Sequence, residues 1–397
     1  MGPRAEAKSR KMVTQKMIFK DYQPMVWERL LRAKSNNRVG SAYLFTGSRG
    51  CGKEWGAIEF AKLLNCENAS GTSCNRCPSC AKFVGLQHPN LKLIVPLPGS
   101  DKSTKSSNPL DALKKEDLEY LTEAIARKGS NPFYKIMVPA ARRITINSIR
   151  DLRKTIYLKS QSNGQKIVLI LDAHLLSAGM GESANALLKI LEEPPPNTTL
   201  ILVSDKKSAL LPTIISRCQP INFPALNLDQ TRLILENDGI ENEQATQIAL
   251  VAKGDVHLAK EISSQSTGKI LAEAEALSKL MTRVNENGWR EFINSNAMLA
   301  ARKPQEFKFR VYLLQLWFHQ AYELRTGEAP NGILPGMTES LQQFNDTYPV
   351  ADLAGINKIL EETVESLVRN LYTPLTLTNL LISVQELLKG KIPISVA

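Results

Sequence analysis

The amino-acid sequence predicts an α/β fold in which a mostly parallel sheet, covered by helices on both faces, is followed by a region of helices alone. Short apolar runs typical of buried strands recur at 41–47, 166–176 and 198–204, with helical patterns between them. A glycine-rich turn follows the first of these runs. After Pro224 the strand patterns stop and only helical periodicity remains.

The first part of the chain contains two predicted strands and three predicted helices. In order, they are a helix over 21–33, a strand over 41–47, a helix over 53–64, a strand over 91–97 and a helix over 112–128. The segment from about 98 to 141 is rich in Ser, Lys, Pro and Asn. We therefore interpret this segment as an insertion that carries one helix.

The second part repeats a strand–helix–strand rhythm before the all-helical region. In order, we expect a strand-like start and a helix over 144–159, a strand within 166–176, a helix over 183–196 stopped by three prolines, a strand over 198–204, and a short helix and an edge strand over 210–223. This organisation predicts a disordered tail over 1–16, an α/β P-loop-like domain over 17–224, a small helical domain over 225–265 and a helical domain over 266–397.

The composition narrows the class of protein. The 397 residues carry a formal net charge of +11, which favours an acidic partner such as nucleic acid without establishing one. No uninterrupted apolar stretch is long enough to span a membrane, and the first residues lack the apolar region of a secretory signal. We therefore expect a soluble, cytoplasmic protein with no membrane partner.

A glycine-rich loop lies between the first predicted strand and the following helix, where phosphate-binding loops occur. Gly47, Gly50 and Gly52 would let backbone N–H groups close around phosphate oxygens, and Lys53 would reach the outer phosphates. The next residue is Glu54, where a Ser or Thr hydroxyl should ligate Mg²⁺, and a carboxylate there would repel a triphosphate. A plain strand–turn–helix corner is the alternative interpretation of this loop.

The end of a later strand carries a second departure from ATPase chemistry. Asp172 and Ala173 follow the apolar run at the place where such ATPases have a Mg²⁺-holding Asp and then a Glu that polarises the attacking water. Ala173 has no polar side chain, and an Asp at the end of a strand also caps helices, which is the alternative for Asp172. Together with Glu54, these residues predict an ATPase fold that does not hydrolyse ATP, and they leave ATP binding in doubt.

Four of the six cysteines are crowded into one polar, turn-rich segment. Cys66, Cys74, Cys77 and Cys80 offer four thiolates within fifteen residues, which is the ligand set of a tetrahedral zinc ion. Because every ligand position would be taken by sulfur, we expect a structural Zn²⁺ site rather than a catalytic one. Reduced structural thiols are the alternative.

The sequence Ser216-Arg217-Cys218 follows the last short predicted helix, close to the edge of the sheet. An arginine there could reach the phosphates of a neighbouring subunit, where a planar and permanently charged guanidinium stabilises a transferring phosphoryl group. Taken on its spacing alone, Arg217 fits a surface salt bridge better. The residues alone therefore leave both roles open.

Taken together, these motifs resemble the AAA+ clamp-loader subunits of the bacterial DNA polymerase III, most closely the delta-prime family. The segments that carry the resemblance are FKD (19–21), AYLFTG (42–47) with its glycine loop, the four cysteines, HPN (88–90), LDA (171–173), ANALLKILEEPP (184–195), LPTIISRC (211–218) and, more faintly, NLYTPLTLTNLL (370–381). The resemblance covers roughly residues 17–265. The insertion at about 98–141 has no counterpart in the family, and the first gap between cysteines is one residue shorter than the family's spacing.

The resemblance implies specific roles for site residues. In that family the Ser-Arg-Cys motif gives an arginine finger to the ATP site of the adjacent motor subunit, which assigns this role to Arg217, flanked by Ser216 and Cys218. The family's helical lid carries a nucleotide-sensing arginine, and His257 stands at that position here. These residues imply a subunit that keeps the ATPase fold without hydrolysing ATP and completes the site of a neighbour.

The resemblance also implies partners. The chain would join motor (gamma/tau) and delta subunits in a hetero-pentamer, with residues 266–397 as the helical collar, and the complex would load the sliding clamp onto primed DNA at the bacterial replisome. Two other functions remain open: an active ATPase subunit of the gamma/tau type, and a zinc-stabilised DNA-binding protein without these partners. ATP turnover by the isolated chain would favour the first, and tight, salt-dependent DNA binding by the chain alone would favour the second.

Overall fold

The computed structural model describes residues 17–99, 108–158, 163–178, 181–264, 267–327, 334, 336–366 and 371–391. The tail predicted over 1–16 lies outside these residues, as does part of the predicted insertion. The chain divides into two compact units. The first runs to Gly239 and also contains Lys253–Leu258, and the second consists of Ile240–Ala252 and the residues from Ala259 onward. The separate helical domain over 225–265 stays a prediction.

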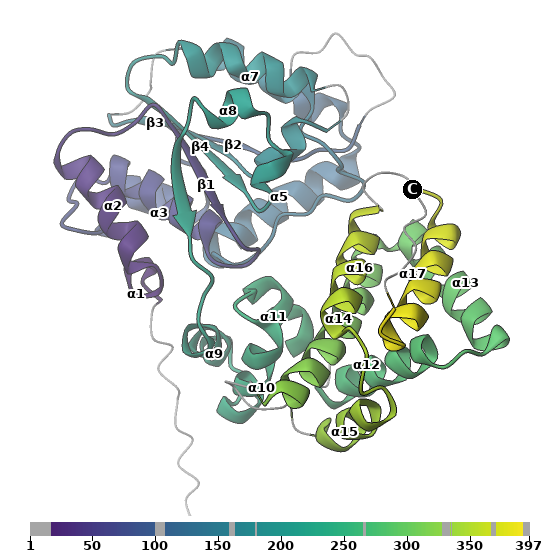
Figure 1. Cartoon of the computed structure of the whole chain (residues 1–397). Coiled ribbons are helices and arrows are strands. Elements are labelled where there is room, and N and C mark those ends of the chain that lie inside the picture. Colours follow the sequence, from purple (N-terminus) through teal and green to yellow (C-terminus); the bar gives the residue numbers. More distant parts are fainter. Residues whose placement is uncertain are drawn as a thin grey trace, which may run out of the picture. The chain divides into compact units, whose positions relative to one another are not determined.

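A five-stranded parallel sheet forms the centre of the first unit (Figure 1). Its strands are β1 (Ala42–Gly47), β2 (Leu91–Ile94), β3 (Lys166–Ile170), β4 (Thr198–Ser204) and β5 (Gln219–Phe223), in the spatial order β2-β3-β4-β1-β5. All neighbouring pairs are parallel, and Leu44 in β1, for example, lies beside Leu202 in β4. The sheet confirms the predicted α/β class and places β5 at an edge, as expected.

Helices cover both faces of this sheet, as Figure 1 shows. They are α1 (Phe19–Tyr22), α2 (Pro24–Ser35), α3 (Lys53–Asn65), α4 (Pro78–Val84), α5 (Lys115–Ser130), α6 (Ile146–Thr155), α7 (Glu182–Glu192), α8 (Pro212–Ile215) and α9 (Leu228–Asn237), with 3₁₀ turns η1 (Pro109–Ala112), η2 (Ala173–Leu176) and η3 (Lys207–Ala209). Successive side chains of a strand alternate between faces. Tyr43 and Phe45 of β1 therefore enter the core beneath α2 and α3, while Leu44 enters the core beneath α6, α7 and α8.

Three predicted elements differ in detail from the observed ones. The predicted helix over 21–33 is split in two, because Pro24 begins α2 without a backbone donor. The strand predicted over 91–97 ends at Ile94. The strand-like start predicted at 144 was wrong: only an isolated bridge joins Leu97 and Arg143, and Thr145 then caps α6 by accepting a hydrogen bond from the backbone N–H of Ser148.

The second unit consists of helices in its described residues. They are α10 (Asn242–Ala252), α12 (Thr267–Thr282), α13 (Glu286–Arg302), α14 (Pro304–Thr326), α15 (Thr338–Thr347), α16 (Leu353–Ser366) and α17 (Thr373–Leu388), together with most of α11 (Val256–Ser263). Helix α14 lies at its centre, where Trp317 meets Phe344 of α15 edge to face, with ring centroids 4.7 Å apart. Among the described residues, no helix combines the length and apolarity needed to cross a membrane.

Candidate functional site

The glycine loop connects β1 to α3 and packs against the start of α11. Gly50 has a positive φ of 71°, and a Cβ atom there would lie 2.2 Å from Asp255 Oδ1, so no other residue fits. The same Asp255 oxygen accepts hydrogen bonds from the backbone N–H groups of His257 and Leu258, at 2.9 and 3.1 Å. Gly52 then adopts the left-handed conformation that begins α3. The loop therefore has the backbone course that its glycines predict.

Lys53 is turned inward and is saturated by the chain's own groups. It is 3% exposed, and its Nζ lies 2.6 Å from Asp205 Oδ1, just beyond the end of β4. The same Nζ donates hydrogen bonds to the backbone carbonyls of Gly47 and Ser48, at 2.9 and 2.5 Å. Although burial opposes ionisation of Asp205, the Lys53 ammonium lowers the pKa of this carboxyl. This lysine is thus already paired with an anion from its own chain.

Glu54 is buried between two lysines that the sequence analysis did not identify. Its Oε2 lies 2.5 Å from the Nζ of Lys128, which is on the last turn of α5, and its Oε1 lies 2.5 Å from the Nζ of Lys135. Lys128 is only 1% exposed. Burial by itself would raise the pKa of Glu54, but the two ammonium groups outweigh this effect and hold the pKa well below its usual range. Glu54 is therefore the anionic centre of a buried ion-pair cluster.

Lys135 also connects Glu54 to Asp172. Its Nζ lies 2.7 Å from Asp172 Oδ1, at the end of β3, so one ammonium group contacts both carboxylates. Burial opposes the charge on Lys135, but Glu54 and Asp172 together raise the pKa of this lysine above its usual value. The side chain of Asp172 makes no capping hydrogen bond to η2, which excludes the helix-cap alternative. The next residue, Ala173, is fully buried.

The loop after α5 seals the cluster. Phe133 is buried, lies over Gly52, and meets Trp55 edge to face with ring centroids 5.5 Å apart. The cavity that remains has a volume of about 10 Å³, room for a single water molecule. Its lining residues are Gly50, Gly52, Lys53, Glu54, Trp55, Lys128, Pro132, Phe133, Lys135, Asp205 and His257. The three lysines and three carboxylates of the cluster cancel in formal charge.

His257 lines the same cavity from the start of α11. Burial and the ammonium groups of Lys128 and Lys135 lower the pKa of His257 to about 3, against the opposing effect of Glu54. The imidazole is therefore neutral at physiological pH. It supplies no fixed positive charge of the kind that an arginine would bring to a phosphate.

The segment Ser216-Arg217-Cys218 joins α8 to β5 and does not line this cavity. Arg217 is about one-third exposed, and its Nη2 lies 2.8 Å from Glu192 Oε1 at the end of α7. Ser216 is exposed and donates to the carbonyl of Thr213 at 3.1 Å. Cys218 is buried in the core beneath α7 and α8, and burial raises the pKa of its thiol to about 11. The structure thus gives Cys218 a packing position, while Arg217 remains accessible.

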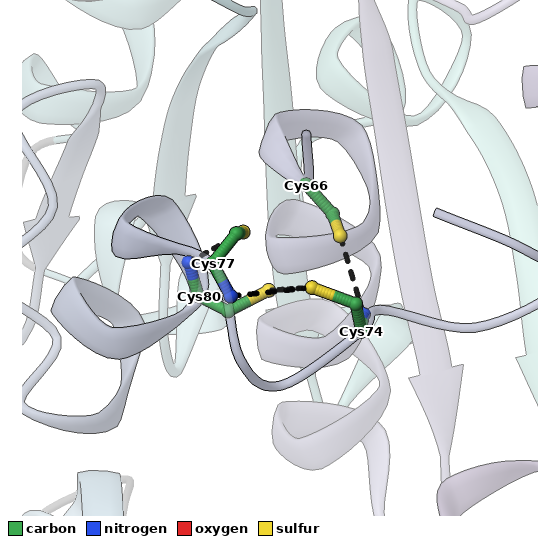
Figure 2. Close-up of side chains that lie close together, drawn as sticks. All are labelled: Cys66, Cys74, Cys77 and Cys80. Carbon is green, nitrogen blue, oxygen red and sulfur yellow. Dashed lines mark hydrogen bonds between the residues drawn. The ribbon is translucent and has the colours of Figure 1, made fainter. Parts of the chain in front are cut away.

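The four clustered cysteines lie close together between the end of α3 and the first turn of α4 (Figure 2). Their sulfur atoms all lie within 4.8 Å of one another, and Sγ of Cys74 is 3.9 Å from Sγ of Cys80. Four sulfurs at the usual Zn–S distance of about 2.3 Å would be roughly 3.8 Å apart. All four are free thiols. The cluster therefore has the composition and spacing that a metal ion requires.

Backbone N–H groups support the thiolate form in this cluster. The N–H of Cys74 donates to Cys66 Sγ at 3.2 Å, that of Cys77 to Cys74 Sγ at 3.3 Å, and that of Cys80 to Cys77 Sγ at 3.4 Å. Backbone hydrogen bonds from Arg76 and Cys77 lower the pKa of Cys74 to about 6. The cluster is also tied to α2, because the indole Nε1 of Trp27 donates to the carbonyl of Gly71 at 2.9 Å.

Comparison with known proteins gives consistent relatives. The model of the family described as "DNA polymerase III, delta subunit" matches residues 22–227. The DNA polymerase III subunit delta' of Bacillus subtilis is 29% identical over 208 residues, which are 52% of this chain and 49% of that protein. The tau subunit of the same polymerase and bacterium is 27% identical over 265 residues, which are 64% of this chain and 39% of that protein. The chain therefore spans half or less of the length of these relatives.

A solved structure also aligns along most of the chain. It is a DNA polymerase III gamma subunit-related protein from Thermotoga maritima, 17% identical, and the alignment covers 91% of this chain and 99% of that chain with a TM-score of 0.38.

Proposed function

Because the chain belongs to the family of DNA polymerase III delta subunits, we propose that it is a clamp-loader subunit of the delta-prime type that does not itself hydrolyse ATP. The observation that carries this proposal is the buried ion-pair cluster in the glycine loop. Lys53, Glu54 and Asp172 would hold phosphate and Mg²⁺ in an active ATPase, and here they bind partners from their own chain. Ala173 and the neutral His257 remove two further groups that hydrolysis uses.

In this role the chain takes one place in a hetero-pentamer with motor (gamma/tau) and delta subunits, and the complex loads the sliding clamp onto primed DNA. Relatives named delta' and tau support membership of such a complex. Arg217 acts in trans, as an arginine finger at the ATP site of the adjacent motor subunit, and its partial exposure supports this role. The helices of residues 266–397 serve as the collar of the ring.

The first test is ATP hydrolysis by the purified, folded chain alone, with and without primed DNA. We expect turnover at background, because the groups that would hold Mg²⁺ and phosphate are paired internally. Turnover near or above about 0.1 s⁻¹, approaching ordinary enzyme rates, would contradict the proposal. That outcome would favour the second candidate, an active subunit of the kind to which the chain's similarity to tau points.

We further propose that the four clustered cysteines bind one structural Zn²⁺. Metal analysis of the purified chain is expected to find about one zinc per molecule. Cys77→Ser should abolish this zinc and lower the melting temperature. Cys218→Ala, which removes a buried thiol outside the cluster, should keep it. A wild-type chain that is folded and contains no zinc would contradict this assignment.

A further inference from the structure

The two carboxylates that contact Lys135 occupy the positions at which phosphate-loop ATPases hold their magnesium ion. Glu54 directly follows the loop lysine, where a Ser or Thr hydroxyl ligates the metal, and Asp172 ends the strand that supplies the metal-holding aspartate. One atom, the Nζ of Lys135, lies 2.5 Å from Glu54 Oε1 and 2.7 Å from Asp172 Oδ1. An ammonium group therefore stands between the two groups that would otherwise share a metal.

A magnesium–nucleotide complex does not fit these residues. The cavity has room for one water molecule, and each lysine of the cluster is already matched by a carboxylate. A triphosphate would need to displace Asp205 from Lys53, and a metal ion would need to displace Lys135. Either event leaves a buried charge without its partner, which is costly in free energy.

The chain holds Lys135 in place from both sides of the loop. Two residues before it, Phe133 packs against Trp55 and over Gly52. Lys128 Nζ donates to the carbonyl of Pro132 at 2.8 Å while it pairs with Glu54. The position of the ammonium group is thus fixed by packing and by hydrogen bonding, and not only by its attraction to carboxylates.

We propose that Lys135 is the resident cation of this site and takes the place of the metal ion. In this arrangement the insertion organises the loop that Mg²⁺ and phosphate organise in an active ATPase, so the site keeps its closed form without nucleotide. The proposal does not depend on clamp-loader partners or on Arg217. Its test uses the full chain alone, and its failure is therefore distinguishable from failure of the proposed function.

Removal of Lys135 creates a site with a defined ligand chemistry. Of the three positive and three negative charges in the cluster, Lys135→Ala leaves two and three, a net charge of −1. The atoms that this change removes correspond to propylammonium, the cation of n-propylamine. A calcium ion is also suitable, because its usual distances of about 2.3–2.6 Å to oxygen are close to those of Nζ. The variant should therefore bind either cation.

The experiment measures the melting temperature of the full-length variants. Lys135→Ala should melt roughly 6 °C or more below wild type, as expected for a broken buried pair. Propylammonium chloride and calcium chloride should each recover most of this loss and leave wild type unchanged. The controls are n-propanol at equal concentration and sodium chloride at equal ionic strength. Lys92→Ala, which removes the half-exposed partner of Asp151, should show no rescue.

A second pair of variants covers the case in which Lys135→Ala does not fold. Lys135→Met with Asp172→Asn removes one charge of each sign and restores the balance. This double variant should melt above Lys135→Met alone, because fewer buried charges are unpaired. Rescue by neither cation beyond the propanol and sodium controls would overturn the proposal. A double variant no more stable than Lys135→Met would overturn it as well.

Discussion

Arg217→Ala is expected to leave the clamp-loader complex assembled and to slow ATP hydrolysis by the adjacent motor subunit by about 10²-fold or more, the order expected for an arginine finger. The guanidinium is planar and always charged, so it stabilises the charge that develops on the transferred phosphoryl group. Its partner in the isolated chain does not prevent this role. Exposed salt bridges such as that between Arg217 and Glu192 contribute about 0–1 kcal/mol, so a phosphate can replace the carboxylate.

The measurement is steady-state ATP turnover of the reconstituted complex with clamp and primed DNA. Two variants serve as controls. Arg217→Lys keeps the charge but loses the two-pronged geometry, so its turnover should also be strongly reduced. Glu192→Ala frees the guanidinium without removing it, and turnover should stay near the wild-type value. If Arg217→Ala assembles and turns over ATP as fast as wild type, the trans role is wrong.

Glu54→Gln is expected to lower the free energy of unfolding of the α/β unit by about 3–5 kcal/mol, the usual cost of breaking a buried ion pair by removing one partner. The amide has nearly the same shape, but it leaves Lys128 with no other carboxylate that the structure shows and leaves Lys135 with Asp172 alone. Hydrogen exchange of α3 and β1, followed in increasing denaturant, measures this change. ATP turnover should remain at background, because Ala173 is unchanged.

The matched control for this variant is Glu59→Gln on the same helix. Glu59 is partly exposed and lies 3.5 Å from Lys62, so its replacement should cost at most about 1 kcal/mol. Combining Glu54→Gln with Lys128→Met removes one charge of each sign and should recover part of the lost stability. Equal effects of Glu54→Gln and Glu59→Gln would show that the cluster is not a major source of stability.

The sheet could be predicted from the sequence where strands are buried on both faces. The apolar runs of β1, β3 and β4 are the three central strands, and no polar residue interrupts their hydrophobic pattern. The segment at 144 also has alternating apolar residues, yet it forms no strand, because the cap at Thr145 starts a helix immediately. Capping depends on one side chain and its geometry, which a hydrophobic pattern does not report.

The glycine loop and the cysteine cluster were predictable because their residues are close in sequence. The cations that complete the loop were not, since Lys128 and Lys135 lie more than seventy residues from Glu54 and no short motif contains them. One signal was present. Lys128 follows Leu121 and Ile125 on the apolar face of its predicted helix, and a charge on a buried face requires a partner. Glu54, an anion in a buried loop, required a cation for the same reason.

The charge balance of the buried cluster also limits how this site can change in evolution. A return to metal binding needs a hydroxyl in place of Glu54 and the removal of two lysines. Each of these substitutions alone leaves a buried charge unpaired, at a cost of several kcal/mol against the 5–15 kcal/mol of stability that a folded protein typically has. The path back to an active site therefore leads through poorly folded intermediates. A lineage that has acquired these lysines is expected to keep an inactive site.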